Sequence, residues 1–241
     1  MGAEIDHETG RGAPDVSLAV LVGGAGSRMG HVNKALLALG GSGGPAGSGG
    51  PENSGGERVL DRLLRRAEPL FAETLLVARD PAPFAAYEGA RRRIVPDLFE
   101  ARSSLTGVHA ALSAAHTSHV FVTACDTPLV SPAVLRLLLS RLTPEIDVLA
   151  PRWEDGHYEP LCAVYSRRCL PFAEALLRAG RYQIVRFFDR VRTEGVPMAA
   201  IRAVDPRLLT FANANTPDEL AALRRLAANP KDPSCPVPGR P

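Results

Sequence analysis

The chain has few cysteines, and those it has do not follow a metal-binding pattern. None of them forms a Cys-x-x-Cys pair or a His/Cys spacing typical of zinc ligands, which argues against a structural zinc site and a disulfide framework. A reducing compartment, the cytoplasm, is therefore the simplest expectation for this protein. The four cysteines are Cys125, Cys162, Cys169 and Cys235.

The chain also lacks a long apolar run and a strong net charge. No run of about 18 apolar residues occurs, and the first residues, MGAEIDHETGRGAPDV, contain no apolar core of an export signal. With 28 basic and 26 acidic residues, the formal net charge of +2 provides no general basic field for nucleic acid. We therefore expect no membrane or nucleic-acid partner, and any phosphate must be bound locally.

The composition predicts one folded domain between two loose ends. A chain of 241 residues can bury a sizeable core and fits a single α/β domain. Residues 1–16 are expected to form a flexible tail, and residues 229–241, NPKDPSCPVPGRP, a disordered one, because Gly, Pro and charges predominate there. The single domain is expected over residues 17–228, with a Gly-rich, linker-like insertion at 40–57.

Within this domain, short apolar segments alternate with segments of helical periodicity. The run 18–22 is continuously apolar, as in strands buried on both faces of a parallel sheet, and HVFVTA at 119–124 is the best strand signal. The alternation predicts an α/β fold with a mostly parallel central sheet and right-handed crossovers. Strands are expected at 18–22, 74–78, 91–95, 119–124, 148–150, 161–165 and 196–204, and helices at 58–70, 105–116, 131–142, 168–179, 184–191 and 217–228.

The stretch Leu18–Lys34, LAVLVGGAGSRMGHVNK, carries the strongest functional signal. Its apolar run ends at Gly23 and Gly24, where the backbone can adopt positive φ and its N–H groups can approach anionic oxygens. Arg28 and Lys34 then add two positive charges near the same turn. The spacing matches neither the dinucleotide pattern GxGxxG nor the Walker pattern GxxxxGK[ST]. The stretch predicts a nucleoside-triphosphate site, with a plain strand-to-helix turn as the alternative.

Three predicted strands are each followed at once by a residue suited to phosphate or metal binding, namely Gly23, Asp97 and Asp126. Ligands of parallel sheets bind beyond the carboxyl ends of the strands, so these residues are expected at one edge. Mg²⁺ needs oxygen ligands and can be held by one carboxylate together with substrate phosphates, and Asp126 is the residue we expect to hold it. The alternative is that Asp126 and Thr127 merely begin a turn or cap the following helix.

Five segments, in order along the chain, resemble the nucleotidyltransferases that act on molybdenum cofactor, above all the molybdenum cofactor guanylyltransferases. They are LVGGAGSRMGHVNK, VPDLFEARSSLTG, TACDTP, EPLCAVY and FANANTPDEL. The resemblance implies a Rossmann-like three-layer sandwich and transfer of GMP from GTP to the terminal phosphate of molybdenum-molybdopterin, releasing pyrophosphate. It also implies Mg²⁺ as cofactor, GTP and molybdopterin as partners, and a molybdoenzyme or its chaperone as a further partner.

The resemblance assigns roles to residues by motif match. Arg28, Lys34 and Asp126 are expected to act in catalysis, with Asp126 as the metal ligand. Gly107, Asn213 and Asn215 are expected on the pterin side. The expected nucleotide-binding residues are Leu21, Val22, Gly23, Gly24, Lys34, Asp97 and Asp126.

Departures from the family pattern leave alternatives open. Where the family shows Gly-Pro-Leu-x-Gly, this chain has SSLTG, which retains only Gly107. The rival enzymes are a CTP-dependent molybdopterin cytidylyltransferase and a sugar-phosphate or phospholactate nucleotidyltransferase of the same fold. Paired Gly23 and Gly24, together with the CDTP and NxNTP segments, favour the guanylyl branch. A catalytically silent nucleotide-binding module, or a chaperone for a molybdoenzyme, is the alternative from another class.

Overall fold

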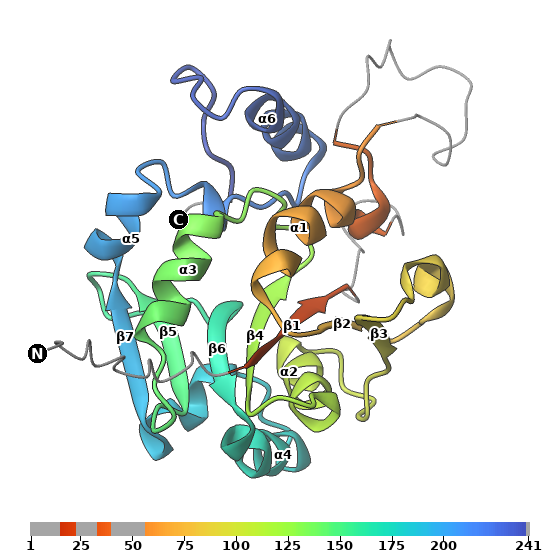
Figure 1. The fold of residues 1–241 in the computed structure, drawn as a ribbon, viewed down its shortest axis with the longest axis vertical. Coiled ribbons are helices and arrows are strands. Elements are labelled where there is room, and N and C mark those ends of the chain that lie inside the picture. The colour runs from red at the N-terminus through yellow and green to blue at the C-terminus, as the bar shows by residue number, and fades with distance from the viewer. Residues whose placement is uncertain (1–14, 23–32, 40–55, 240–241) are drawn as a thin grey trace, which may run out of the picture.

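The computed structural model describes residues 15–22, 33–39 and 56–239, which form an α/β structure around one seven-stranded sheet (Figure 1). The strand order is β3-β2-β1-β4-β6-β5-β7. All pairings are parallel except the two made by β6, which runs against β4 and β5. The predicted mostly parallel α/β fold is therefore confirmed.

The strands form where the sequence is apolar on both faces. Five of the six residues of β1, and all four of β2, are buried, as expected for strands covered by helices on both sides. The strand predicted at 119–124 has those bounds. The strands are β1 Val16–Leu21, β2 Thr74–Val77, β3 Arg92–Val95, β4 His119–Ala124, β5 Val148–Arg152, β6 Cys162–Ser166 and β7 Thr193–Pro197.

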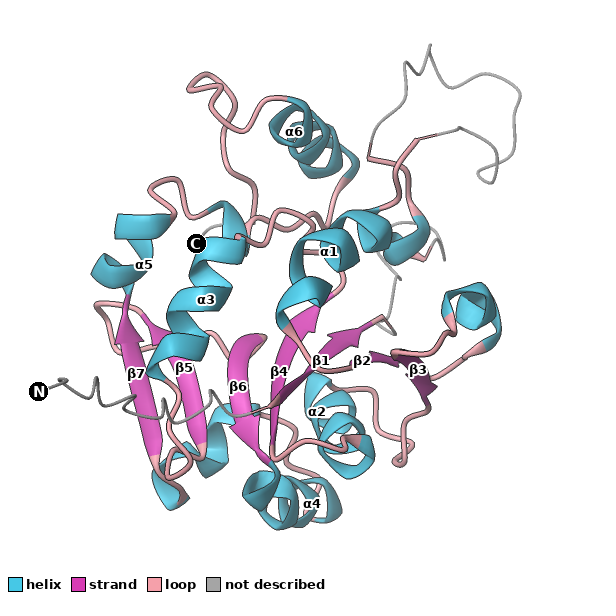
Figure 2. Cartoon of the chain, viewed as in Figure 1, coloured by secondary structure: helices cyan, strands magenta, loops and turns pink. Residues whose placement is uncertain are grey.

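Helices cover both faces of the sheet and make three layers (Figure 2). Helices α1 Val59–Ala67, α3 Pro132–Arg141 and α5 Met198–Val204 share one apolar core with one face, whereas α2 Ser104–Ala114 and α4 Leu170–Arg178 share another with the opposite face. Helix α6 Pro217–Ala228 belongs to a third, smaller cluster with the segment around Leu39. Short 3₁₀ turns lie at Lys34–Leu36, Glu68–Leu70, Ala82–Tyr87, Arg167–Cys169, Ile184–Arg190 and Leu209–Phe211. None of the helices in the described part of the chain is long and apolar enough to cross a membrane.

The strand expected at 196–204 is wrong in its position and length. Strand β7 ends at Pro197 after pairing with β5, and the chain continues as helix α5. Met198 and Ile201 are buried three residues apart, which is the spacing of one helix face rather than of a strand. An apolar run of this length does not by itself distinguish the two.

The carboxyl-terminal segment differs from the disordered tail expected at 229–241. Up to Gly239 the chain is described, and Cys235 is buried with 3% of its surface exposed. The guanidinium of Arg207 donates hydrogen bonds to the carbonyls of Pro230 (2.7 Å) and Cys235 (2.6 Å). The prediction of disorder rested on composition, which contains no information on these contacts with residues distant in the sequence. Of the other predicted irregular segments, residues 1–14 and 40–55 lie outside the described residues.

Candidate active site

The first four strands of the sheet end in line at one edge. Leu21, the last residue of β1, is paired with Val77 on β2 and Ala124 on β4, and Val77 is paired with Val95 on β3. A hydrogen bond of 3.1 Å from the amide of Cys125 to the carbonyl of Leu21 continues this pairing beyond β4. The residues that follow these strands therefore lie along the same edge.

Asp97 and Asp126 lie at this edge, shortly beyond the ends of β3 and β4. Because β2 and β1 lie between those strands, three spacings of ~4.8 Å place the two strand ends about 14 Å apart. Residues that follow these two strand ends would contact different parts of a ligand that spans the edge. Gly23, Gly24 and Arg28 lie outside the described residues, and their roles stay predictions.

Asp126 is a half-buried carboxylate whose charge is only partly compensated. Burial raises the pKa of Asp126, and the positive charge of Lys34 opposes that rise. Among the residues that the structure describes, the one hydrogen bond that acts on this carboxylate comes from its own backbone amide, which also lowers the pKa. A group in this state is free to bind a cation.

The neighbouring thiol of Cys125 is not set up for nucleophilic chemistry. Its burial raises the pKa of Cys125 to about 12, so the thiol stays protonated near neutral pH. The negative charge of Asp126 contributes to the same rise. Cys125 therefore acts as a small buried apolar residue.

Lys34 opens a 3₁₀ turn and reaches a segment far along the chain. The side chain of Asn33 caps this turn by accepting a hydrogen bond from the amide of Ala35 at 3.1 Å. The Nζ of Lys34 donates to the carbonyl of Ala214 and to Oδ1 of Asn215, both at 2.9 Å. An ammonium has three N–H donors, so within the described residues one donor of Lys34 remains for an anionic oxygen.

The three residues expected on the pterin side are in different surroundings. Asn215 contacts Lys34 directly. Asn213 has its Oδ1 buried with no hydrogen-bond partner in the described structure, and this atom lies against Gly239 of the carboxyl-terminal segment. The structure thus joins Asn215 to the Lys34 site and places Asn213 beneath the end of the described chain.

Gly107 is needed for close packing between α2 and β1. A Cβ atom at this position would lie 2.9 Å from Cδ2 of Leu21, closer than real Cβ contacts. Leu21 is half-buried at the tip of β1, and Val22, which follows it, is 2% exposed. Gly107 therefore determines where the side chain of Leu21 lies.

Asp97 lies beyond β3, the outermost strand at its end of the sheet. Burial raises the pKa of Asp97, and the positive charge of Arg79 opposes that rise. The guanidinium of Arg79 donates a hydrogen bond of 2.5 Å to the carbonyl of Glu100, which holds it over the loop that follows β3. A carboxylate of this kind can accept hydrogen bonds from the N–H or O–H groups of a ligand.

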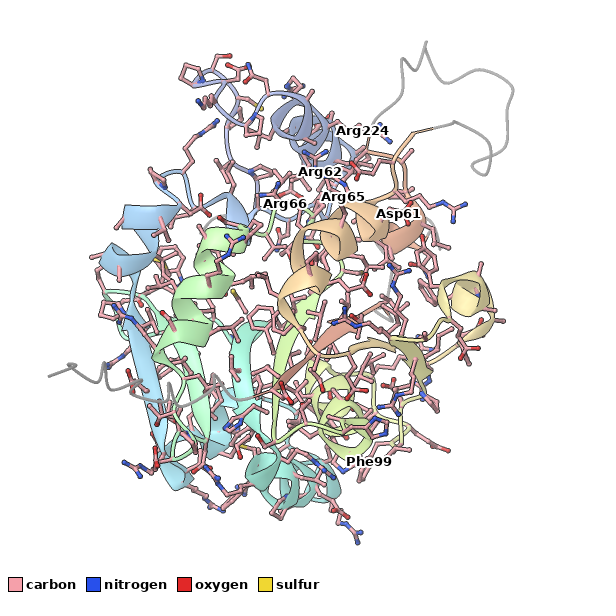
Figure 3. The ribbon with its side chains drawn as sticks, viewed as in Figure 1. Asp61, Arg62, Arg65, Arg66, Phe99 and Arg224 are labelled. Carbon is pink, nitrogen blue, oxygen red and sulfur yellow. The ribbon has the colours of Figure 1, made fainter. Side chains whose placement is uncertain are left out.

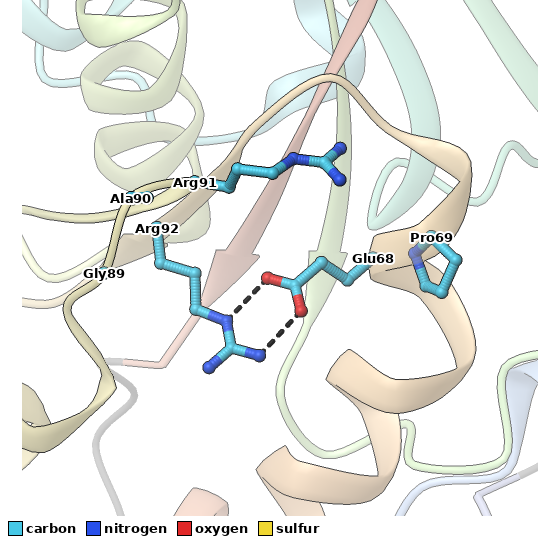
Figure 4. A pocket seen from close by; sticks show the side chains of 6 residues that line it. All are labelled: Glu68, Pro69, Gly89, Ala90, Arg91 and Arg92. Atoms are coloured by element: carbon cyan, nitrogen blue, oxygen red, sulfur yellow. Dashed lines mark hydrogen bonds and ion pairs between the residues drawn. The ribbon is translucent and has the colours of Figure 1, made fainter.

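A hollow in the surface lies away from this edge (Figure 4). Arg92 begins β3, so the hollow is at the opposite end of the strands. Its Arg92 and Glu68 side chains form two hydrogen bonds of 2.6 Å with each other, which neutralise their charges. The hollow is therefore not the candidate active site. It is lined by Glu68, Pro69, Gly89, Ala90, Arg91 and Arg92.

Sequence reasoning missed one residue at the site, Glu219. Its carboxylate accepts a hydrogen bond of 2.7 Å from the backbone amide of Asn215. The sequence segment TPDE at 216–219 was sufficient to predict a helix start, but its proximity to Lys34 depends on tertiary structure. No group of three or more His, Cys, Asp or Glu residues able to hold a metal occurs in the described ranges.

Comparison with known proteins agrees with this architecture. A family model described as the MobA-like NTP transferase domain matches residues 18–196. Molybdenum cofactor guanylyltransferase from Desulfosudis oleivorans is 34% identical over 201 residues, which cover 83% of this chain and 90% of the relative. A probable molybdenum cofactor guanylyltransferase from Methanosarcina mazei is 32% identical, with 85% of this chain and 88% of the relative covered.

A solved structure shows the same fold at similar length. Molybdopterin-guanine dinucleotide biosynthesis protein A from Archaeoglobus fulgidus has a TM-score of 0.70 and 28% identity, with 88% of this chain and 98% of that chain covered. The match of the family model over most of the chain and the identity to full-length relatives agree with the three-layer fold. The chain belongs to the family of MobA-like NTP transferases.

Proposed function

We propose that this nucleotidyltransferase transfers GMP from GTP to the terminal phosphate of molybdenum-molybdopterin, forming the guanine dinucleotide cofactor and pyrophosphate. The observation that supports this most is that the charge of Lys34 acts on Asp126, which lies beyond β4 at the ligand-binding edge of a fold whose relatives are named molybdenum cofactor guanylyltransferases. Free thiols at all four cysteines agree with the cytoplasm as the site of this reaction.

The reaction requires charge neutralisation more than a protein nucleophile. An oxygen of the terminal pterin phosphate forms a bond to the α-phosphorus of GTP, and the bond from that phosphorus to the bridging oxygen of pyrophosphate breaks. Both reactants are negatively charged, so positioning and cations provide most of the catalysis. The remaining N–H donor of Lys34 would bind a phosphate oxygen, while its other two hold the ammonium in place.

The residues present fit a magnesium ion at Asp126. A half-buried carboxylate that accepts a hydrogen bond only from its own backbone amide, among the described residues, suits an ion that takes one or two carboxylates and completes its shell with phosphate oxygens and water. Bound there, Mg²⁺ would neutralise charge on the triphosphate and on the leaving pyrophosphate. Asp126 would fix the position of the triphosphate relative to Lys34.

Asp97 would bind the nucleoside part of GTP. Its strand ends about 14 Å along the edge from the strand that precedes Asp126, at ~4.8 Å per strand, so it would face the ribose or base while Asp126 faces the phosphates. Its carboxylate can accept hydrogen bonds from ribose hydroxyls or from guanine N–H groups. Leu21 and Val22, at the end of β1 between these two positions, would contact the middle of the nucleotide.

Calorimetry with GTP, CTP, ATP and UTP, each with Mg²⁺, tests this proposal. Selective binding of GTP, followed by transfer of GMP to molybdopterin with release of pyrophosphate, is the expected result. Preference for CTP would instead support the cytidylyltransferase alternative. Binding without pyrophosphate release in the presence of molybdopterin would support a silent nucleotide-binding protein.

A further inference from the structure

The amino end of α6 has more hydrogen bonds than a helix cap needs. In a capping box, the N3 glutamate accepts from the N-cap amide, and the N-cap hydroxyl accepts from the N3 amide. Both bonds occur here: Glu219 Oε2 accepts from the Thr216 amide at 2.9 Å, and Thr216 Oγ1 accepts from the Glu219 amide at 3.2 Å. The same Oε2 accepts a further bond, the shortest of the three, from the Asn215 amide at 2.7 Å.

That further bond fixes a residue that holds Lys34. The backbone of Asn215 is bound to Glu219 on one side, and its side chain accepts from Lys34 Nζ on the other. The preceding carbonyl, of Ala214, accepts the second bond of Lys34. We infer that Glu219 is a positioning residue for the reaction, which acts through Asn215 to orient the ammonium of Lys34 toward the triphosphate. This inference rests on the proposed function and assigns the orientation to residues beyond 18–196, the range matched by the family model.

Further contacts make α6 and the Lys34 segment one unit. The Nε of Arg224, on α6, donates to the carbonyl of Ala38 at 3.0 Å, four residues from Lys34. Leu39 and Leu223 lie in the same apolar cluster. Figure 3 shows Arg224 near the arginines of α1, and one of these, Arg62, donates to the carbonyl of Ala227 at the other end of α6. Because these contacts hold α6 in place, a change at its amino end is expected to alter the position of Lys34.

The electrostatics agree with this geometry. The pKa of Glu219 is lowered, chiefly by the hydrogen bond from the Asn215 amide, and the positive charge of Lys34 contributes to the same shift. Glu219 is therefore an ionised acceptor near neutral pH. Glu219 therefore has two roles: it caps α6, and it fixes the position of Asn215. Separate variants can distinguish these two roles.

The test compares Glu219→Ala with two matched variants. Glu219→Ala removes the bond to Asn215 together with half of the cap, and Thr216→Ala removes the other half of the cap while it leaves the carboxylate on Asn215. Glu219→Gln retains an acceptor oxygen, since glutamine also serves at N3 of a capping box. KM for GTP, kcat, the Kd for GTP with Mg²⁺ and the melting temperature are measured for each variant.

Glu219→Ala is expected to weaken GTP binding by about fivefold to tenfold, the size of one lost hydrogen bond. Thr216→Ala is expected to lower the melting temperature as much as Glu219→Ala does, but to leave GTP binding unchanged. Glu219→Gln is expected to retain most of the wild-type affinity for GTP. Equal loss of affinity in Thr216→Ala, or wild-type affinity in Glu219→Ala, would overturn the inference. Failure of the wild-type protein to bind GTP would instead contradict the proposed function on which it rests.

Discussion

Lys34 and Asn215 are 181 positions apart in the sequence, yet Nζ of the lysine donates a 2.9 Å hydrogen bond to Oδ1 of the asparagine. The bond joins the segment that follows the glycine-rich sequence at 23–30 to the segment that precedes α6. Since the charge of Lys34 also acts on Asp126, the same lysine links the expected metal ligand to the carboxyl-terminal part of the chain. The site therefore depends on both ends of the described structure.

Lys34→Ala is expected to abolish GMP transfer and to leave the protein folded. The variant loses the only ammonium near Asp126 among the described residues, and with it the neutralisation of the triphosphate, while Ala214 and Asn215 are left without their donor. Pyrophosphate release and the circular dichroism spectrum provide the two readouts. Lys231→Ala removes the chain's other lysine, which is exposed, and should behave as the wild type. Transfer at the wild-type rate by Lys34→Ala would show that Lys34 is not catalytic.

Asp126→Asn is expected to remove activity and to stabilise the protein in the absence of ligand. Burial raises the pKa of Asp126 in the folded protein, so its contribution to stability is fully present below the unfolded pKa of 3.8 and is lost as pH rises through the folded pKa. At pH 7 the variant should melt about 2 °C or more above the wild type, with the difference vanishing near about pH 3.

The same variant tests metal binding through ligand-induced stabilisation. Mg²⁺ with GTP should raise the melting temperature of the wild type, because ligands that bind only the folded state stabilise it. Asp126→Asn should lose that rise. Asp189→Asn, at an exposed aspartate, is the control and should retain both the wild-type melting temperature and the ligand response. A full ligand response in Asp126→Asn would rule out Asp126 as the metal ligand.

Gly107→Ala is expected to displace Leu21 and to weaken nucleotide binding more than it weakens folding. The new Cβ would lie 2.9 Å from Leu21 Cδ2, so the end of that side chain must move. Folding changes little, because alanine is favoured over glycine in a helix by about 1 kcal/mol, which offsets the strain. Calorimetry with GTP and urea denaturation separate the two effects. Gly89→Ala, where no atom lies within 4 Å of the added Cβ, is the matched control.

Arg62→Ala is expected to cost more stability than Arg65→Ala, although both arginines form ion pairs with Glu57. The Arg62 side chain is 15% exposed and also donates to the carbonyl of Ala227 on α6, whereas Arg65 is 63% exposed. Loss of a partly buried charged donor costs about 2 kcal/mol, and loss of an exposed ion pair less than about 1 kcal/mol. Urea denaturation measures the free energy of unfolding of both variants. Equal losses of stability would mean that the bond from Arg62 to α6 does not contribute to stability.

The sequence was sufficient to predict those elements that are encoded by neighbouring residues. Strand β4 has the predicted bounds, and the acidic residues that follow β3 and β4 lie at the predicted edge, because a buried apolar run and a turn are encoded by neighbouring residues. The helix predicted after Thr216 begins at Pro217 with a capping box, which is also a pattern of four adjacent residues.

The sequence by itself determined the order of strands and helices from β1 to α4, the edge at which Asp97 and Asp126 lie, and the resemblance to the family. Only the tertiary structure decided that Asn215 holds Lys34, that Glu219 binds the amide of Asn215, that Gly107 packs on Leu21, and that the proline-rich segment up to Gly239 is folded. The physical reason is distance along the chain. Propensity and periodicity arise from interactions between near neighbours, whereas these contacts join residues brought together by burial of the sheet and of α6.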